Sequence, residues 1–389
     1  MHLAIVTETF PPEINGVAMT FGHLAEELAR RGHRVTVYRP RGSQGADTQQ
    51  AAATFEEIAM PGLPIPGYPQ LQMGHPAGAA LRARWRKERP DLVHVVTEGP
   101  LGVSAIRAAR RLGIPVTSSF HTHFHAYTRH YGLGLLRPLA LAWLRYVHNR
   151  TARTFAPTAQ LCAELESQGF ERLLVLSRGI DTARFTPAKR CEKLRSTWGA
   201  RPDDPVVLHV GRMAPEKNYE LLFQAYAWMR SVNSRCRFVL VGDGPLRPTL
   251  AREHYTCVFP GFVSREELAR HYASADLYLH ASLTETYGNV FAEAMASGLA
   301  VAGFDYAAAR EFAQHERNAL LAAVDQPREL IAAGVRLAVD GELRTRLRES
   351  ARAAVLDRTW SHVADRFEAD LMAVVSACPL PHATQSAYA

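Results

Sequence analysis

The sequence predicts an α/β protein with two Rossmann-like, doubly wound domains that face each other across a cleft. The chain has 389 residues, which suits two domains of roughly 150–200 residues each better than one core. Short apolar segments alternate with amphipathic helical segments, and the alternation starts afresh near residue 205. This alternation is typical of parallel strands joined by right-handed helical crossovers.

The first half begins with a strand, a loop and a helix. Residues 3–8 (LAIVTE) form a buried type of strand, and residues 11–16 (PPEING) form a loop. Phe21, Leu24 and Leu28 follow helical spacing within residues 17–31. Further strands are expected at 34–40, 91–96 and 115–121, with a helix at 102–112.

The second half repeats the pattern. A helix is expected at 219–232, and strands are expected at 205–212, 237–245, 257–263, 275–282 and 300–305. Residues 177–205 are rich in Gly and Pro and read as a hinge. We therefore expect an N-terminal domain at 1–180, a C-terminal domain at 181–359, and a helix at 360–378 that crosses back to the N-terminal domain.

Composition limits the class of protein. Hydrophobic residues make up 47% of the chain and charged residues 21%, as in water-soluble globular proteins. No apolar run reaches the roughly 18–20 residues that a membrane span needs. The first residues read as a strand rather than a signal peptide. Five scattered cysteines favour free thiols and a cytoplasmic location over a disulfide framework.

The positive charge is confined to the first half. Residues 1–180 carry 20 Lys+Arg and 13 Asp+Glu, a net charge of +7, whereas residues 181–389 carry 25 of each. One interpretation is a solvated surface with scattered ion pairs. The other is an anionic partner for the first half, such as a nucleic acid, an acidic glycan or the surface of a membrane.

The segment from Glu285 to Glu293 carries the strongest chemical signal. It places two carboxylates eight residues apart, directly after an expected strand. Gly288 permits a tight loop, and a helix is expected to begin near Asn289, so the amides from Gly288 through Phe291 form a helix N-terminus that suits an anion. The alternative interpretation is a solvated acidic pair that caps a helix.

This segment resembles the E-x7-E motif of glycosyltransferase family 4, whose members have the two-domain GT-B fold. Other segments match that family in order and spacing, and together they span nearly the whole chain: 11–17 (PPEINGV), 209–218 (HVGR through EKN), 242–245 (GDGP) and 261–263 (GFV). The resemblance implies a retaining hexosyltransferase that uses a nucleotide diphosphate sugar.

The resemblance also implies residue roles. Arg212 and Lys217 would clamp the diphosphate, Glu293 would hold the ribose, and Glu285 the hydroxyls of the donor sugar. The remaining donor-binding positions are Gly16, Gly211, Gly242, Gly244, Phe262 and Val263, together with Gly288, Asn289 and Val290. Asn15 stands where the family often has a second glycine.

His121 follows an expected strand and opens the run His121, His123, His125. By resemblance, His121 would face the donor sugar, and it joins Arg212, Lys217 and Glu285 in the catalytic set. Three alternating histidines also permit a metal site. GT-B enzymes generally need no metal, so we expect none.

A second resemblance lies at residues 177–187, where Ser177-Arg178-Gly179-Ile180-Asp181 is similar to a variant found in glycolipid mannosyl- and glucosyltransferases. It implies GDP-mannose as the leading donor and UDP-glucose as the next. Arg178 stands where the family commonly has an asparagine. Gly179 is assigned to a turn and Asp181 to a helix cap, and neither is expected to be catalytic.

The expected mechanism is front-face attack, in which the departing phosphate oxygen takes the proton of the acceptor hydroxyl. The acceptor would be a lipid or a glycan bound by the N-terminal domain. Residues 134–153 are expected to form a basic helix with Trp143 and several leucines, suited to peripheral contact with an anionic membrane. The competing interpretation of this helix is an ordinary core helix with a solvated outer face. The competing interpretations of the whole protein are a nucleotide-sugar epimerase, a sugar-nucleotide sensor and a nucleic-acid binder. The last does not explain the motifs, so no nucleic-acid partner is expected.

Overall fold

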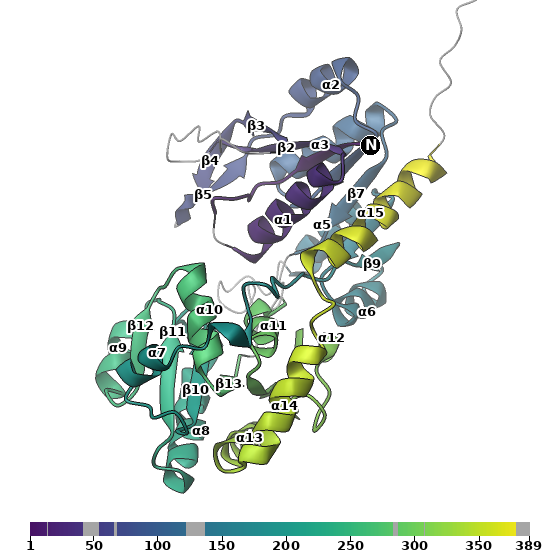
Figure 1. The fold of residues 1–389 in the computed structure, drawn as a ribbon. Helices are drawn as coiled ribbons and strands as arrows, with labels where there is room; N and C mark the ends of the chain where they lie inside the picture. The colour runs from purple at the N-terminus through teal and green to yellow at the C-terminus, as the bar shows by residue number, and fades with distance from the viewer. Residues whose placement is uncertain are drawn as a thin grey trace, which may run out of the picture. The chain divides into compact units, whose positions relative to one another are not determined.

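The computed structural model of the chain describes residues 1–13, 15–41, 54–65, 68–121, 137–282, 287–306 and 308–378. These residues form two compact units, one from Met1–Ser177 together with Trp360–Ala389 and the other from Arg178–Thr359 (Figure 1). Residues 178–205, which the sequence suggests as a hinge, fold as part of the second unit. They include a 3-10 helix, η2 (Pro187–Lys189), and the helix α7 (Glu192–Thr197).

The first unit has a seven-stranded parallel sheet in the order β3-β2-β1-β6-β7-β8-β9. Its strands are β1 (His2–Val6), β2 (Arg34–Pro40), β3 (Glu56–Met60), β6 (Leu92–Val95), β7 (Val116–Ser119), β8 (Arg153–Ala156) and β9 (Leu173–Val175). An antiparallel pair, β4 (Gly62–Ile65) and β5 (Tyr68–Gly74), follows β3 and was not expected from the sequence.

Helices cover both faces of this sheet. They are α1 (Gly16–Arg30), α2 (Gly78–Lys87), α3 (Pro100–Arg111), α5 (Arg137–His148), α6 (Ala159–Ser167) and α15 (Trp360–Ala377). Because strand side chains alternate, Leu3 and Ile5 of β1 pack with α1 and α15, whereas Ala4 and Val6 pack with α2 and α3. Figure 1 shows α15, at the yellow end of the chain, beside α1.

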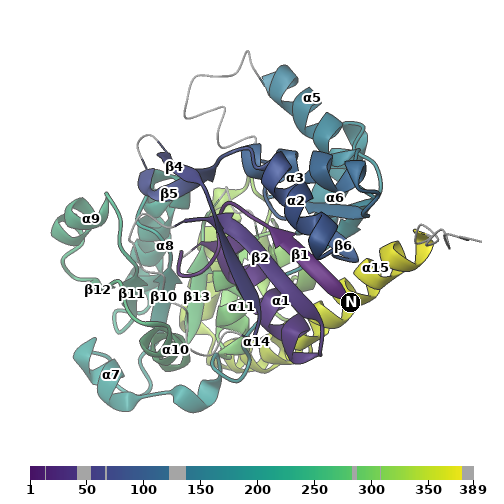
Figure 2. The ribbon, with the colours of Figure 1, turned by 90° about the horizontal axis from the view of Figure 1, so that it is seen from above.

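The second unit has a six-stranded parallel sheet in the order β12-β11-β10-β13-β14-β15, and the labels of its first four strands follow this order in Figure 2. Its strands are β10 (Val206–Val210), β11 (Arg237–Val241), β12 (Val258–Gly261), β13 (Leu277–His280), β14 (Ala300–Phe304) and β15 (Leu320–Ala322).

Its helices are α8 (Tyr219–Val232), α9 (Arg247–Glu253), α10 (Arg265–Ser274), α11 (Asn289–Ala296), α12 (Ala308–Phe312), α13 (Pro327–Val339) and α14 (Gly341–Ala353), with a 3-10 helix, η3 (Pro215–Lys217). Val207, Phe238 and Leu240 face a core with α8 and α13. Val206, Leu208 and Val239 face the opposite core with α10 and α11. Both faces are apolar, as in buried parallel sheets.

One expectation about a helix end is wrong. The helix expected at 134–153 ends at His148, and Arg153 begins β8 instead. Asn149 explains the early end, because its side chain donates to the carbonyl oxygen of Gly169 and accepts from the amide of Glu171.

All five cysteines are free thiols, as expected. Within the described residues, no helix is long and apolar enough to cross a membrane.

Candidate active site

The strand order of each sheet places a ligand site at a particular edge. In open α/β sheets, ligands bind beyond the carboxyl ends of the strands where the strand order reverses. In the second unit the reversal lies between β10 and β13, and in the first unit between β1 and β6. We call the two strands on either side of this point the reversal strands. In the second unit, Arg212 and Lys217 follow the reversal strand β10, and the start of α11 follows the reversal strand β13.

The loops after β10 and β11 are joined by backbone hydrogen bonds. The amide of Gly211 donates to the carbonyl oxygen of Val241 at 3.0 Å, and the amide of Met213 donates to that of Asp243 at 2.8 Å. The amide of Leu246 then donates to the carbonyl oxygen of Met213 at 3.0 Å. These bonds hold the two loops together at the carboxyl edge of the sheet.

Gly242 and Gly244 make this close approach possible. Gly242 has φ +137°, and a Cβ there would lie 2.0 Å from the carbonyl oxygen of Gly211. Gly244 has φ +156°, and its Cβ would lie 2.5 Å from the carbonyl oxygen of Met213. Both glycines are therefore explained by the packing of one loop on the other.

Gly211 differs, because a Cβ there would meet only ordinary contacts, at 3.5 Å from Nε2 of His209 and 3.9 Å from Cε of Lys217. Packing in the described structure does not require a glycine at this position. The side chain of Lys217 therefore lies beside the backbone of residue 211 without crowding it.

Arg212 and Lys217 are held by the turn between β10 and α8. Arg212 is exposed, and its carbonyl oxygen accepts a hydrogen bond from the Tyr219 hydroxyl at 3.4 Å. Lys217 ends η3, and Asn218 follows in the left-handed region with φ +56°. Burial and the nearby charge of Glu216 raise the pKa of Tyr219, so its hydroxyl stays a donor. The turn presents two cations at one strand end.

The start of α11 lies beside an arginine, Arg178, to which the sequence pattern assigns no role in the site. Gly288 is the N-cap of α11 with φ +89°. Arg178 is only 8% exposed, its guanidinium donates to Oδ1 of Asn289 at 3.4 Å, and it lies 5.5 Å from the ring centroid of Tyr287. The Tyr287 hydroxyl donates to the Arg178 carbonyl oxygen at 3.3 Å. A buried guanidinium is thereby placed at a helix N-terminus, where both favour an anion.

Glu293 lies on the second turn of α11 with a side chain only 14% exposed. The Tyr272 hydroxyl is 3.3 Å from Oε2 of Glu293 and 3.2 Å from the Val290 carbonyl oxygen. Arg265 is 4.0 Å from Oε1. Burial raises the pKa of Glu293, although the nearby Arg265 opposes this shift. The carboxylate is thus oriented by its neighbours and retains capacity to accept hydrogen bonds.

Phe262 and Val263 follow β12 at the same edge of the sheet. Phe262 is 70% exposed, whereas Val263 packs partly against the core beneath it. Gly261, with φ +83°, precedes them, and Ser264 caps α10 by accepting from the Glu267 amide at 3.2 Å. The turn therefore presents an aromatic ring on a well-defined backbone.

Gly16 and His121 belong to the first unit. Gly16 begins α1, and Oδ1 of Asn15 caps that helix by accepting from the amides of Val17 at 3.1 Å and Ala18 at 2.9 Å. Capping explains why an asparagine replaces the second glycine. His121 is half-buried after β7, with its ring 5.7 Å from that of Phe21 in an edge-on contact.

Several expected site residues lie outside the described residues. They are Glu285, His123 and His125, as well as Ile14 of the N-terminal loop. Among the residues that are described, no cluster of three or more His, Cys, Asp or Glu side chains could hold a metal ion.

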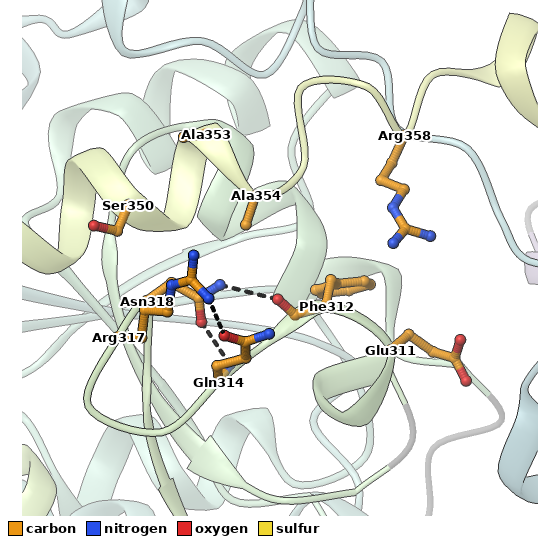
Figure 3. Close-up of a pocket in the computed structure, with 9 residues that line it drawn as sticks. All are labelled: Glu311, Phe312, Gln314, Arg317, Asn318, Ser350, Ala353, Ala354 and Arg358. Atoms are coloured by element: carbon orange, nitrogen blue, oxygen red, sulfur yellow. Dashed lines mark hydrogen bonds between the residues drawn. The ribbon is translucent and has the colours of Figure 1, made fainter.

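A cavity of about 450 Å³ opens elsewhere in the second unit (Figure 3). Its described lining comes from α12, from the loop before β15, and from α14 and the residues after it. Arg317 donates to Gln314 at 2.8 Å, and Asn318 donates to the Phe312 carbonyl oxygen at 3.0 Å. None of the motif residues described above lines this cavity, so it is separate from the strand-end site.

Comparisons with known proteins match both halves of the chain. A family model described as Glycosyltransferase Family 4 matches residues 14–184, and one described as Glycosyl transferases group 1 matches residues 204–340. A GDP-mannose-dependent alpha-mannosyltransferase from Mycobacterium tuberculosis is 35% identical over 367 residues, which cover 94% of each chain. An alpha-monoglucosyldiacylglycerol synthase from Streptococcus pneumoniae is 26% identical, covering 77% of this chain and 70% of that one.

The fold is also found in solved structures. The crystal structure of Anabaena HepE in complex with UDP has a TM-score of 0.77 at 20% identity, covering 96% of this chain and 100% of that one. The structure of WaaG, a glycosyltransferase involved in lipopolysaccharide biosynthesis, has a TM-score of 0.67 at 18% identity, covering 95% of this chain and 99% of that one. The two parallel-sheet units have the GT-B fold predicted from the sequence.

Proposed function

The chain belongs to glycosyltransferase family 4, and from that premise we propose that it transfers mannose from GDP-mannose to a membrane glycolipid precursor with retention of anomeric configuration. Transfer of a hexose to an acceptor hydroxyl is the activity of its relatives and of this chain. The observation that carries the proposal is the pairing of Arg212 and Lys217 beside the open backbone of Gly211, at the strand end where the sheet order reverses.

The proposed chemistry rests on the leaving group. Breaking the bond between sugar and phosphate leaves growing negative charge on a nucleoside diphosphate. Arg212 offers a planar fork of donors and Lys217 a mobile positive charge, and both stabilise that charge as it develops. The departing phosphate oxygen takes the proton of the acceptor hydroxyl. With two side-chain cations and the amides of α11 available, the reaction needs no metal ion.

The other donor contacts follow from the same edge of the sheet. We assign the ribose hydroxyls to Glu293, whose orientation by Tyr272 and Arg265 suits a diol. The exposed ring of Phe262, with Val263, would meet the base, and Glu285 and His121 would bind the donor sugar. The amides of Gly288, Asn289 and Val290 face the diphosphate together with Arg178, and Gly242 and Gly244 shape the loop.

The acceptor and the membrane form the second part of the proposal. Three apolar side chains of α5 are exposed: Leu139 at 70%, Trp143 at 45% and Tyr146 at 46%. The rings of Trp143 and Tyr146 stack at 5.6 Å, and the guanidinium of Arg150 lies 3.4 Å from the centroid of Tyr146. Aromatic rings flanked by arginines suit the interface of an anionic bilayer, so peripheral contact is proposed for this surface.

The direct test is transfer of labelled sugar from GDP-mannose, GDP-glucose, UDP-glucose and UDP-galactose, using purified protein with a bacterial total-lipid extract. The proposal expects label in the organic phase with GDP-mannose and with none of the other three donors. An α-mannosidase should then release the label from the lipid product, which would show an α linkage. Transfer from UDP-glucose would replace mannose by glucose as the substrate. A β-linked product would overturn retention, and equal activity after removal of divalent ions with EDTA is expected.

A further inference from the structure

The two reversal strands of the first unit end beside each other, and their loops are joined through Glu8. Glu8 follows β1, and Thr97 follows β6, the neighbouring strand. The backbone amide of Glu8 donates to Oγ1 of Thr97 at 2.8 Å. Glu8 therefore lies at the position in this sheet where an open α/β fold binds a ligand.

The Glu8 carboxylate is seated on the first residues of α3. Its Oε1 accepts a hydrogen bond from the Leu101 amide at 3.1 Å. A Cβ on Gly99 would lie 2.1 Å from both carboxylate oxygens. Gly99 has φ −68°, which any residue adopts, so its backbone conformation does not require glycine. The space that Gly99 leaves is filled by the Glu8 carboxylate.

Capping alone does not explain a carboxylate here. Burial, assisted by the charge of Glu98, raises the pKa of Glu8 to about 7 in spite of the Leu101 amide. An uncharged glutamine would accept the same amide hydrogen bond without the cost of burying a charge. Within the described residues, the only hydrogen bond to the carboxylate is the one from Leu101. Its second oxygen retains the capacity to accept hydrogen bonds from a ligand.

We infer that Glu8 binds the acceptor by accepting hydrogen bonds from hydroxyl groups of an uncharged, polyhydroxylated head group. This inference rests on the proposed transferase function. A carboxylate accepts two hydrogen bonds from neighbouring hydroxyls of a sugar or polyol. Above pH 7, where Glu8 is mainly ionised, a phosphate at this place would meet repulsion from Glu8 and Glu98, so the part of the acceptor that lies here is neutral. Orientation of the attacking hydroxyl is the contribution of this contact to the reaction.

The test compares Glu8→Gln with the unmodified full-length protein, using octyl α-mannoside as a neutral acceptor. Glutamine keeps the bond to the Leu101 amide, so the melting temperature should stay within about 2 °C. We expect kcat/KM for octyl α-mannoside to fall at least about tenfold, as for loss of one hydrogen bond to a charged group. The dissociation constant for GDP, measured by calorimetry, should stay unchanged.

A second variant displaces the carboxylate without altering Glu8. Gly99→Ala places a methyl group where the carboxylate lies, and the flexible Glu8 side chain must move away. It should reproduce the acceptor defect. Gly78→Ala is the matched control, because a Cβ there meets nothing closer than 3.4 Å.

Binding of octyl α-mannoside, followed by saturation-transfer NMR, tests the inference even if no nucleotide sugar is turned over. Failure of the proposed function would appear as absent transfer by the unmodified protein. Failure of the inference would appear as glycoside binding by Glu8→Gln and Gly99→Ala within twofold of the unmodified protein. That result would leave Glu8 as a helix cap only.

Discussion

Gly242 lacks a side chain because the carbonyl oxygen of Gly211 occupies the place where one would begin, whereas no protein atom crowds that place at Gly211. The sequence motif names both as donor-binding glycines and does not separate them. The structure gives each glycine a different physical reason. Gly242 allows two loops to approach each other, whereas Gly211 leaves the backbone uncovered at a strand end.

This difference predicts that alanine at Gly242 lowers the stability of the protein, whereas alanine at Gly211 lowers its affinity for GDP. Gly242→Ala should destabilise the protein by about 1–3 kcal/mol or more, because it combines φ +137° with a clash against backbone. Gly211→Ala should leave the free energy of unfolding within about 0.5 kcal/mol and weaken GDP binding. Urea unfolding and calorimetric titration measure the two quantities. Equal stability losses in both variants would contradict the assignment of Gly211 to a ligand.

Lys217 is predicted to matter for rate rather than for folding. Lys217→Ala should lower kcat at least about 100-fold, the loss expected on removing one group that stabilises developing charge. Lys193→Ala is the control, since Lys193 is an exposed lysine on α7 of the same unit. Steady-state kinetics with GDP-mannose, or with whichever nucleotide sugar the transfer test selects, provide the measurement. A Lys217→Ala enzyme within a few-fold of the Lys193→Ala enzyme would remove Lys217 from the catalytic set.

Arg178 shows where reading of the sequence stops. Arg212, Lys217 and Glu293 stand in spaced motifs, so the placement of the first two after a strand and of Glu293 inside a helix could be predicted from local pattern. The contact of Arg178 with Asn289 joins residues 111 positions apart and depends on the packing of α11. Its one sequence signal is the arginine in Ser177-Arg178-Gly179, where pattern alone explains only Gly179, as a turn residue. Glu8 was missed for the same reason, because its partner Leu101 is 93 residues away.

At the scale of elements, β6 and β7 are joined by a buried histidine. His94 of β6 is fully buried, with Nδ1 2.8 Å from Oγ1 of Thr117 and Nε2 3.0 Å from Oγ of Ser119. Burial lowers the pKa of His94 to about 3. His148 of α5 lies 2.9 Å from Oγ of Ser118, and burial lowers its pKa to about 4. Strand periodicity predicted the strands but not these polar contacts within the core.

The two histidines predict loss of stability in mild acid. Both stay neutral in the folded protein below pH 6.5 but take up protons on unfolding, so the unfolded chain binds up to two more protons. The contribution of the two histidines to stability should therefore fall as pH drops from about 6.5 toward 4, by up to about 2.7 kcal/mol per pH unit. Glu8, whose pKa is raised to about 7, binds its extra proton in the folded protein and offsets up to about half of this slope. Urea unfolding between pH 7 and 4.5 measures the slope. His94→Gln should reduce the slope relative to His75→Gln, an exposed control, and equal slopes would contradict the explanation.

At the scale of the whole molecule, the repeated strand–helix pattern was enough to predict two parallel-sheet units and the GT-B fold, because parallel strands joined by helices leave few topologies. The pattern was not enough for β4 and β5, whose glycines and prolines carry no strand periodicity. The helix expected at 360–378 is α15, which belongs to the first unit and packs beside α1. The two helices share a buried apolar core, and Arg31 adds a hydrogen bond to Glu368 at 2.7 Å across 337 positions.

The uneven charge is a property of the whole chain, and it predicts how the protein meets a membrane. The first 180 residues carry the entire net charge of +7, and α5 adds exposed Trp143 and Tyr146. Binding to phosphatidylglycerol vesicles should exceed binding to phosphatidylcholine vesicles. It should weaken as ionic strength rises from about 0.1 to 1 M, because the Debye length falls from about 10 to 3 Å.

Substitution of two exposed tryptophans distinguishes vesicle binding through α5 from vesicle binding through any exposed aromatic side chain. Trp143→Ser should weaken vesicle binding at least about fivefold in co-sedimentation, since an aromatic anchor at the interface is lost. Trp228→Ser should not, although Trp228 is 61% exposed, because it lies on α8, outside the basic first 180 residues. Equal loss in both variants would mean that exposed aromatic area alone drives binding. No loss in either, with salt dependence retained, would assign the membrane contact to arginines outside α5.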